Sequence, residues 1–98
     1  MVQTVKSLML VAGDGMIIFE KPRVLRRIFV KIVSVLPRNE LYKSHISFDD
    51  PMFHSYFLIT EGHPEFEAKG DGIFQGDIWL RNQSSISIYY TATEILVE

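Results

Sequence analysis

Hydrophobic and polar residues alternate along most of this chain, in short segments that turn-forming residues separate. Between the turns, the segments are rich in Val, Ile, Phe, Tyr and Thr, which fit a pleated sheet, whereas strong helix formers are sparse. Alternation with a period of two is typical of strands that bury one face. The pattern predicts an all-β fold, with strands at about residues 3–12, 16–20, 28–36, 41–48, 52–60, 72–80 and 86–97.

The segments 41–48 and 52–60 predict a hairpin whose tip is Asp49-Asp50. Asp and Pro at this tip favour a tight turn, and opposite residues of a hairpin share one face of the sheet. This register separates an apolar face from a mostly polar one. The predicted pairs are Ile46 with Phe53, Tyr42 with Phe57, His45 with His54 and Lys43 with Tyr56.

Two other segments carry local predictions. A single helical turn fits only Pro22–Arg27, since proline is accepted at the first position of a helix. The last segment alternates on one face from Ile86 to Tyr90 and then changes parity at Ile95, which predicts a bulge or bend near residues 92–94. The residues expected in the core are Phe29, Val33, Ile46, Phe48, Phe57, Ile78, Leu80 and Ile88.

Composition supports one compact domain over residues 1–98. Hydrophobic residues make up 47% of the chain, and seven Phe, four Tyr and one Trp suffice for one modest core. Apolar runs fall short of the roughly 18 residues of a membrane helix, and no signal peptide is recognisable, so we expect no membrane partner and an intracellular or virion location. The lack of cysteine excludes disulfides, thiolate nucleophiles and sulfur-bound zinc.

The middle of the chain resembles the Sm and LSm-like RNA-binding proteins. It carries Phe48-Asp49-Asp50-Pro51-Met52 after an apolar strand and turn, an acidic Glu61 nine residues after Met52, and Gln75-Gly76 in a later apolar context. The family places an Asp-x-x-Met-Asn motif, an acidic residue and an Arg-Gly turn there. The resemblance spans residues 28–80 and implies a small, strongly bent antiparallel barrel that assembles into rings.

Two positions differ from the family pattern. Phe53 and Gln75 stand where the family's Asn and Arg hold a flipped-out base. The resemblance therefore supports the barrel better than it supports base-specific RNA binding. The same short strands also fit a jelly-roll β-sandwich, the fold of many viral coat and tail proteins, and this alternative stays open.

Charge is unevenly distributed along the sequence. Residues 1–43 hold eight Lys or Arg against three acids, and residues 44–98 hold two against nine. A basic cluster can neutralise phosphates, which predicts weak, salt-dependent binding of single-stranded RNA. A solvated surface and head-to-tail self-association through opposite charges are the alternatives. The candidate RNA-binding residues are Arg23, Arg26, Arg27, Lys31, Phe53 and Gln75.

The remaining chemical candidates are few. His45 opposite His54 gives two imidazole ligands but no third, so the expected interpretation is a surface pair without metal. Asp49 and Asp50 would share one solvated environment, which does not separate an acid from a base. We therefore expect no enzyme activity and no cofactor. The predicted function is a non-enzymatic homo-oligomeric β module, Sm-like, or alternatively a viral or phage-type structural subunit.

Overall fold

A computed structural model describes residues 2–22, 25–36, 41–69 and 76–97. The all-β prediction is confirmed, and Leu25–Arg27, at the predicted helical turn, belongs to a strand. The expected strand at 52–60 is confined to its last four residues, and a strand at 65–69 was not predicted. The eight strands are β1 (Val2–Leu10), β2 (Gly15–Phe19), β3 (Leu25–Leu36), β4 (Lys43–Phe48), β5 (Phe57–Thr60), β6 (Glu65–Lys69), β7 (Ile78–Asn82) and β8 (Ser87–Val97).

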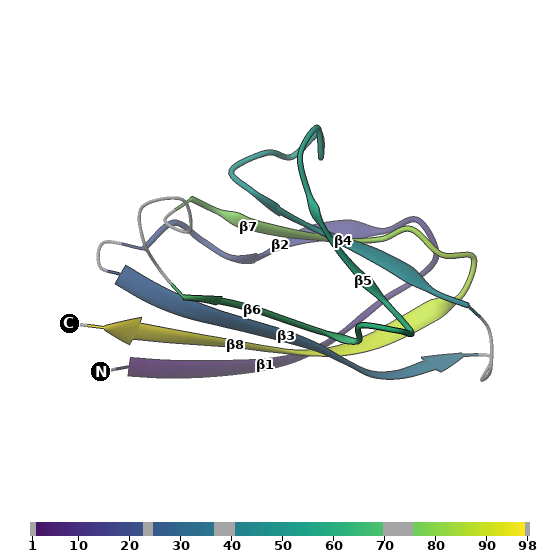
Figure 1. Cartoon of the computed structure of the whole chain (residues 1–98), viewed down its shortest axis with the longest axis horizontal. Coiled ribbons are helices and arrows are strands. Elements are labelled where there is room, and N and C mark those ends of the chain that lie inside the picture. Colours follow the sequence, from purple (N-terminus) through teal and green to yellow (C-terminus); the bar gives the residue numbers. More distant parts are fainter. Residues whose placement is uncertain (1, 23–24, 37–40, 70–75, 98) are drawn as a thin grey trace.

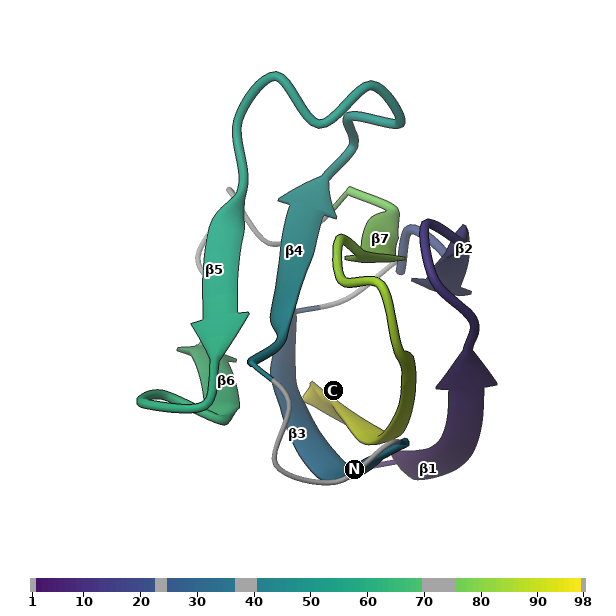
Figure 2. The same cartoon turned by 90° about the vertical axis from the view of Figure 1, so that its right-hand side faces the viewer.

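The strands form two antiparallel sheets of four, in the orders β1-β8-β3-β6 and β2-β7-β4-β5. The two sheets stack as layers, with the chain termini on adjacent strands of one layer (Figures 1 and 2). The first strand pairs with the last, the second with the seventh, the third with the sixth and the fourth with the fifth. The described strands form a two-sheet, sandwich-like arrangement, so the closed barrel that the Sm resemblance implied is wrong.

The core lies between the two sheets. Ile46, Ile78, Leu80 and Ile88 are buried there, as alternation predicted. Phe48 is half-buried and packs against this core, as predicted. Phe29 is half-buried without belonging to it, and Val33 and Phe57 are exposed, so the core prediction is wrong for these three. The other buried hydrophobic residues of the main core are Leu10, Ile18, Phe19, Ile28, Val30, Ile32, Ile59, Ile86, Tyr90 and Ala92.

The misplaced residues of β3 have one physical cause. This strand is apolar at both parities, so alternation alone does not choose its inner face. Ile28 and Val30 take the buried side, which turns Phe29 outward. The register with β8 then shifts between Ile32 and Ser34, which leaves Val33 as an extra, outward residue.

The bulge predicted near residues 92–94 is absent from the described pairings of β8. Its register with β1 is continuous from Leu96 to Ile88. The inner face continues past Ala92 to Glu94, whose carboxylate forms a 3.0 Å ion pair with the fully buried Arg26. Arg26 also donates to the carbonyl oxygens of Glu20 and Gly76. A buried ion pair thus occupies the place where the alternation appeared to break.

The predicted register of the 41–60 hairpin is also wrong. Ile46 pairs with Phe57 and His45 with Leu58, so residues 49–56 form a long loop instead of a tight turn. The Asp50 carboxylate organises this loop, because it accepts the backbone N–H groups of Met52, His54 and Ser55 at 2.7–3.2 Å. These bonds hold the loop in a shape that the simple hairpin did not include.

Candidate functional site

The 49–56 loop rises from the ends of β4 and β5 (Figure 1) and covers the part of the outer face of the β2-β7-β4-β5 sheet around His45, while Leu58 on the same face is 49% exposed. Phe53 is 7% exposed, and its ring lies 4.2 Å from the guanidinium carbon of Arg81. The Tyr56 ring stacks on the buried His45 ring with centroids 3.8 Å apart. We call this arrangement of loop and sheet the covered face.

Beneath the loop lie three polar side chains, those of His45, Ser47 and Arg81, each with a buried polar atom. Arg81 Nη2 lies 3.0 Å from His45 Nδ1, which fits donation by the guanidinium to a neutral imidazole. Burial, followed by the charges of Arg81 and Lys43, lowers the pKa of His45 to about 4. Within the described part of the chain, His45 Nε2, Ser47 Oγ and Arg81 Nε are buried without a hydrogen-bond partner.

This group is not arranged for nucleophilic catalysis. An activated serine needs a base within hydrogen-bond reach of its hydroxyl, and Ser47 Oγ makes no hydrogen bond among the described residues. The aromatic rings of Phe53 and Tyr56 also pack directly on Arg81 and His45. The covered face is therefore packed against its own loop.

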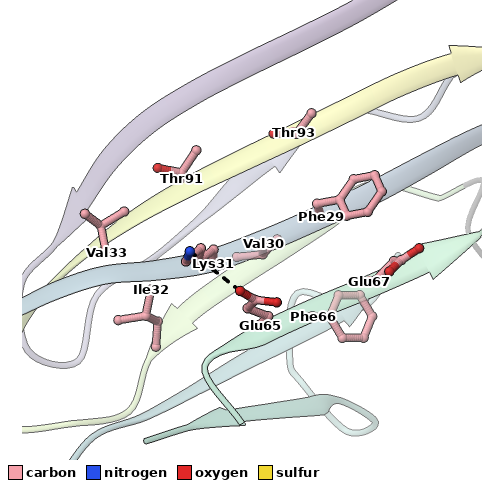
Figure 3. Close-up of a pocket in the computed structure, with 10 residues that line it drawn as sticks. All are labelled: Phe29, Val30, Lys31, Ile32, Val33, Glu65, Phe66, Glu67, Thr91 and Thr93. Carbon is pink, nitrogen blue, oxygen red and sulfur yellow. Dashed lines mark ion pairs between the residues drawn. The ribbon is translucent and has the colours of Figure 1, made fainter.

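The outer face of the β1-β8-β3-β6 sheet has no such cover among the described segments, and we call it the bare face. A groove of about 510 Å³ runs along β3 between its two neighbouring strands. Figure 3 shows Phe29 and Lys31 on β3, with Thr91 and Thr93 on one side and the β6 carboxylates on the other. The groove thus combines an aromatic ring, hydroxyls and charged groups on an open surface.

Exposed apolar side chains extend the bare face beyond this groove. Val5 is 55% exposed and Val33 is 60% exposed, and Met9 and Tyr89 are also exposed. A second groove, of about 340 Å³, includes Met9, Val33 and Tyr89 among its lining residues. Contiguous exposed apolar surface of this kind marks interaction sites more often than isolated residues do.

Charges on the bare face are interleaved. Lys31 on β3 pairs in register with Glu65 on β6, and Lys31 Nζ and Glu65 Oε1 form a 3.6 Å ion pair. Glu67 pairs with Phe29 on the same strands. Lys31 of the first half of the chain therefore lies beside Glu65 of the second half, on the same face, whereas the head-to-tail alternative assumed clusters on different sides.

The described candidate RNA-binding residues do not gather on one face. Arg26 is fully buried between the sheets, and Phe53 is buried on the covered face. Arg27 is exposed, whereas Lys31 pairs with Glu65. Arg23 and Gln75 lie outside the described residues. RNA binding stays a prediction that this arrangement of side chains does not favour.

The two candidate metal-binding histidines, His45 and His54, do not pair with each other as predicted. His45 lies under Tyr56 and pairs with Leu58, while His54 is exposed in the loop, 3.5 Å from Asp50. In the part of the chain that the structure describes, no three or more His, Asp or Glu side chains are placed to hold a metal ion. No helix of these residues is long and apolar enough to span a membrane.

Sequence reasoning missed Arg81 and Tyr56. Arg81 meets His45 because β4 pairs with β7, a contact between residues 36 positions apart that no local pattern specifies. Tyr56 was expected within a strand, and it became a covering residue only because the loop is longer than predicted. No family model and no curated protein matches this chain.

Proposed function

We propose that this protein is a non-catalytic structural subunit of the jelly-roll type, which assembles through its β1-β8-β3-β6 sheet. The order of strand pairing supports the jelly-roll assignment. Pairing first with last, second with seventh, third with sixth and fourth with fifth is that of one long hairpin rolled into two sheets. Such sandwiches recur in viral capsid and lectin domains, so the fold is compatible with a viral or phage-type coat protein.

The observation that carries the proposal is the difference between the two outer faces. The chain uses its own Phe53 and Tyr56 to cover the β4–β7 face, where polar groups are buried. On the other sheet, Val5, Val33 and Met9 stay exposed. Burial of such side chains stabilises an assembly by about 1.5–3 kcal/mol for each one that is fully buried. A second copy supplies the cover that this chain does not provide.

A small domain also gains from assembly. About 100 residues bury only about two thirds of the surface that the unfolded chain exposes, so the stability of the isolated domain is modest. Closed symmetric assembly adds buried surface without adding sequence. The perturbed His45 makes no contact with a nucleophile, so the covered face gives no support to an enzyme.

Sedimentation velocity over a range from micromolar to hundreds of micromolar tests the proposal. The unmodified chain is expected to form a discrete oligomer in the tens of micromolar. A double variant of the bare face, Val5→Lys with Val33→Lys, is expected to stay monomeric. Leu58→Lys is the matched control, because Leu58 is 49% exposed on the other sheet. A strictly monomeric unmodified chain, or a double variant that assembles normally, would overturn the proposal.

A further inference from the structure

The open edge of β1 is the longest of the sandwich among the described strands. β1 pairs on one side with β8 and forms its sheet's end on the other, so alternate backbone N–H and C=O groups point away from the sheet. Its register with β8 is uninterrupted from Val2 to Leu10. The side chains from Val2 to Ser7 are all exposed, which leaves this edge accessible to another strand.

The protection of β1 as an edge strand is limited to one lysine. Natural edges are protected by short length, Pro, bulges or charged side chains, including inward-pointing ones, and the nine-residue segment VQTVKSLML has no Pro and one charge. That charge, on Lys6, is turned toward the other sheet, where Nζ donates to the carbonyl oxygen of Ile18 at 2.7 Å. Nζ also lies 4.9 Å from the centre of the Phe19 ring. Lys6 therefore does not project into the path of an added strand.

The other described edges differ from β1. β6 has five residues and carries Glu65 and Glu67. β5 has four residues, and β2 has five with a register irregularity between Ile17 and Phe19. Short, charged or irregular edges disfavour strand addition. Of these edges, only β1 offers a long regular template.

The sequence of β1 is self-complementary in one antiparallel register. A continuous sheet keeps both outer faces on one side, so opposite residues must have the same parity. With Val5 of each copy on the two-fold axis, Val2 lies opposite Leu8 and Gln3 lies opposite Ser7. Thr4 then lies opposite Lys6. Apolar residues meet apolar residues, and polar residues meet polar residues, without like charges in contact.

Neighbouring registers are worse. An axis on Lys6 puts two ammonium groups directly opposite each other, which is destabilising. An axis on Thr4 shortens the paired segment and puts Val2 opposite Lys6. An axis on Ser7 requires Leu10 to pair with Thr4, although Leu10 is 3% exposed and belongs to the core. The register centred on Val5 is thus favoured over each alternative.

We propose that two copies of this chain pair edge to edge through β1, antiparallel and with Val5 on the two-fold axis. Their two four-stranded sheets then join into one continuous eight-stranded sheet. This inference rests on the proposed function, and it adds an edge contact that is distinct from the covering of the bare face: edge pairing leaves Val33 uncovered, and a further copy covers the extended face. The added backbone hydrogen bonds satisfy the open edge in both copies at once.

Cysteine crosslinking tests the register directly, because the natural chain contains no cysteine. Opposite Cα atoms in an antiparallel pair lie about 4.5–5.5 Å apart, which suits a disulfide. Under mild oxidation, Val5→Cys is expected to give a linked dimer that non-reducing electrophoresis detects. Val33→Cys is the matched control, since it is equally exposed on the same face but far from the predicted axis in register.

Charge variants test the same contact without oxidation. Val5→Lys places two ammonium groups on the axis and is expected to raise the dimer Kd by about tenfold or more, whereas Val33→Lys leaves the dimer Kd near that of the unmodified chain. Far-ultraviolet circular dichroism and denaturation confirm that each variant is folded. The crosslinking result and the Kd values of the charge variants are compared with sedimentation velocity of the unmodified chain.

The outcomes separate the inference from the proposed function. Selective linking at position 5 with selective weakening by Val5→Lys supports the edge contact. An oligomer that links at position 33 but not at position 5, or at neither, overturns the edge contact but leaves assembly standing. A strictly monomeric unmodified chain overturns both.

Discussion

The two sheets of this sandwich treat their outer faces in opposite ways. On the covered face, the 49–56 loop places Phe53 over Arg81 and Tyr56 over His45, so that His45 is buried and Arg81 is half-buried. On the bare face, Phe29 is only half-buried and Val33 is 60% exposed. Both faces carry aromatic and charged groups, so composition alone does not distinguish them.

The difference shows which face the chain packs with its own aromatic residues and which face it leaves exposed; the proposed assembly uses the exposed face. Enclosing polar atoms is unfavourable unless they are paired, and three buried atoms under the loop have no partner among the described residues. The covered face therefore depends on tight aromatic packing to stay closed. The charged side chains of the bare face are exposed to water, so they pay no desolvation penalty and change the free energy of unfolding little.

The largest expected effect is at the junction that holds the two sheets together. Arg26→Met leaves the Glu94 carboxylate, which is 12% exposed, without its 3.0 Å partner. Breaking a buried ion pair in this way typically lowers the free energy of unfolding by about 3–5 kcal/mol. Urea denaturation measures the loss. Arg27→Met, one residue away and exposed, is the control, and equal losses in both variants would contradict the account.

The next effect compares one phenylalanine from each outer face. Phe53→Ala removes the ring that packs on Arg81, and the free energy of unfolding is expected to fall by about 3 kcal/mol. Phe29→Ala on the bare face is expected to cost about 0.5 kcal/mol or less in the monomer. Denaturation at low protein concentration checks both values. Similar costs would remove the distinction between the faces.

The covered face also predicts how stability depends on pH. The pKa of His45 is about 4 in the folded protein and 6.5 ordinarily, so the unfolded chain binds the extra proton between these values. Stability from this group is complete above pH 6.5 and falls as the pH drops toward 4, by on the order of 3 kcal/mol. Denaturation at several pH values, with NMR titration of the imidazole, measures it.

Two histidine variants isolate this pH dependence. His45→Gln is expected to flatten the dependence between pH 6.5 and 4, since the buried titrating group is gone. His54→Gln should retain it, because His54 lies in the loop with its side chain 80% exposed. A His45 imidazole that titrates near its ordinary value would show that the loop does not exclude water.

The smallest effect concerns the bare face. Lys31 and Glu65 are 3.6 Å apart, with side chains 62% and 67% exposed. Ion pairs in this setting contribute about 0.2–1 kcal/mol. A double-mutant cycle with Lys31→Ala and Glu65→Ala is expected to give a coupling energy at the low end of this range. Coupling of several kcal/mol would mean that the bare face is structurally closed.

Much of the strand content follows from the sequence, because alternation marks inner positions such as Ile46, Leu80 and Ile88. The inner face of β3 does not follow, since both of its parities are apolar and only the pairing with β8 decides between them. The choice between barrel and sandwich depends on long-range pairing of this kind, which local patterns do not encode.

The candidate site was harder to predict than the fold. The resemblance in the Asp49-Asp50-Pro51-Met52 region directed attention to a base-binding loop, whereas Asp50 in fact organises a loop that packs on its own sheet. Arg26 was expected at the surface because adjacent basic residues suggest a patch. In a strand, adjacent side chains point to opposite faces, so Arg26 is buried while Arg27 is exposed.

The central claim is that one sheet is left for assembly and the other is closed by its own loop. A dilution series followed by two-dimensional amide NMR tests it most directly. We predict concentration-dependent shifts along β1 and its neighbour β8, with none at His45, Phe53 or Arg81. Shifts centred on the covered face, or spectra independent of concentration up to hundreds of micromolar, would contradict the claim.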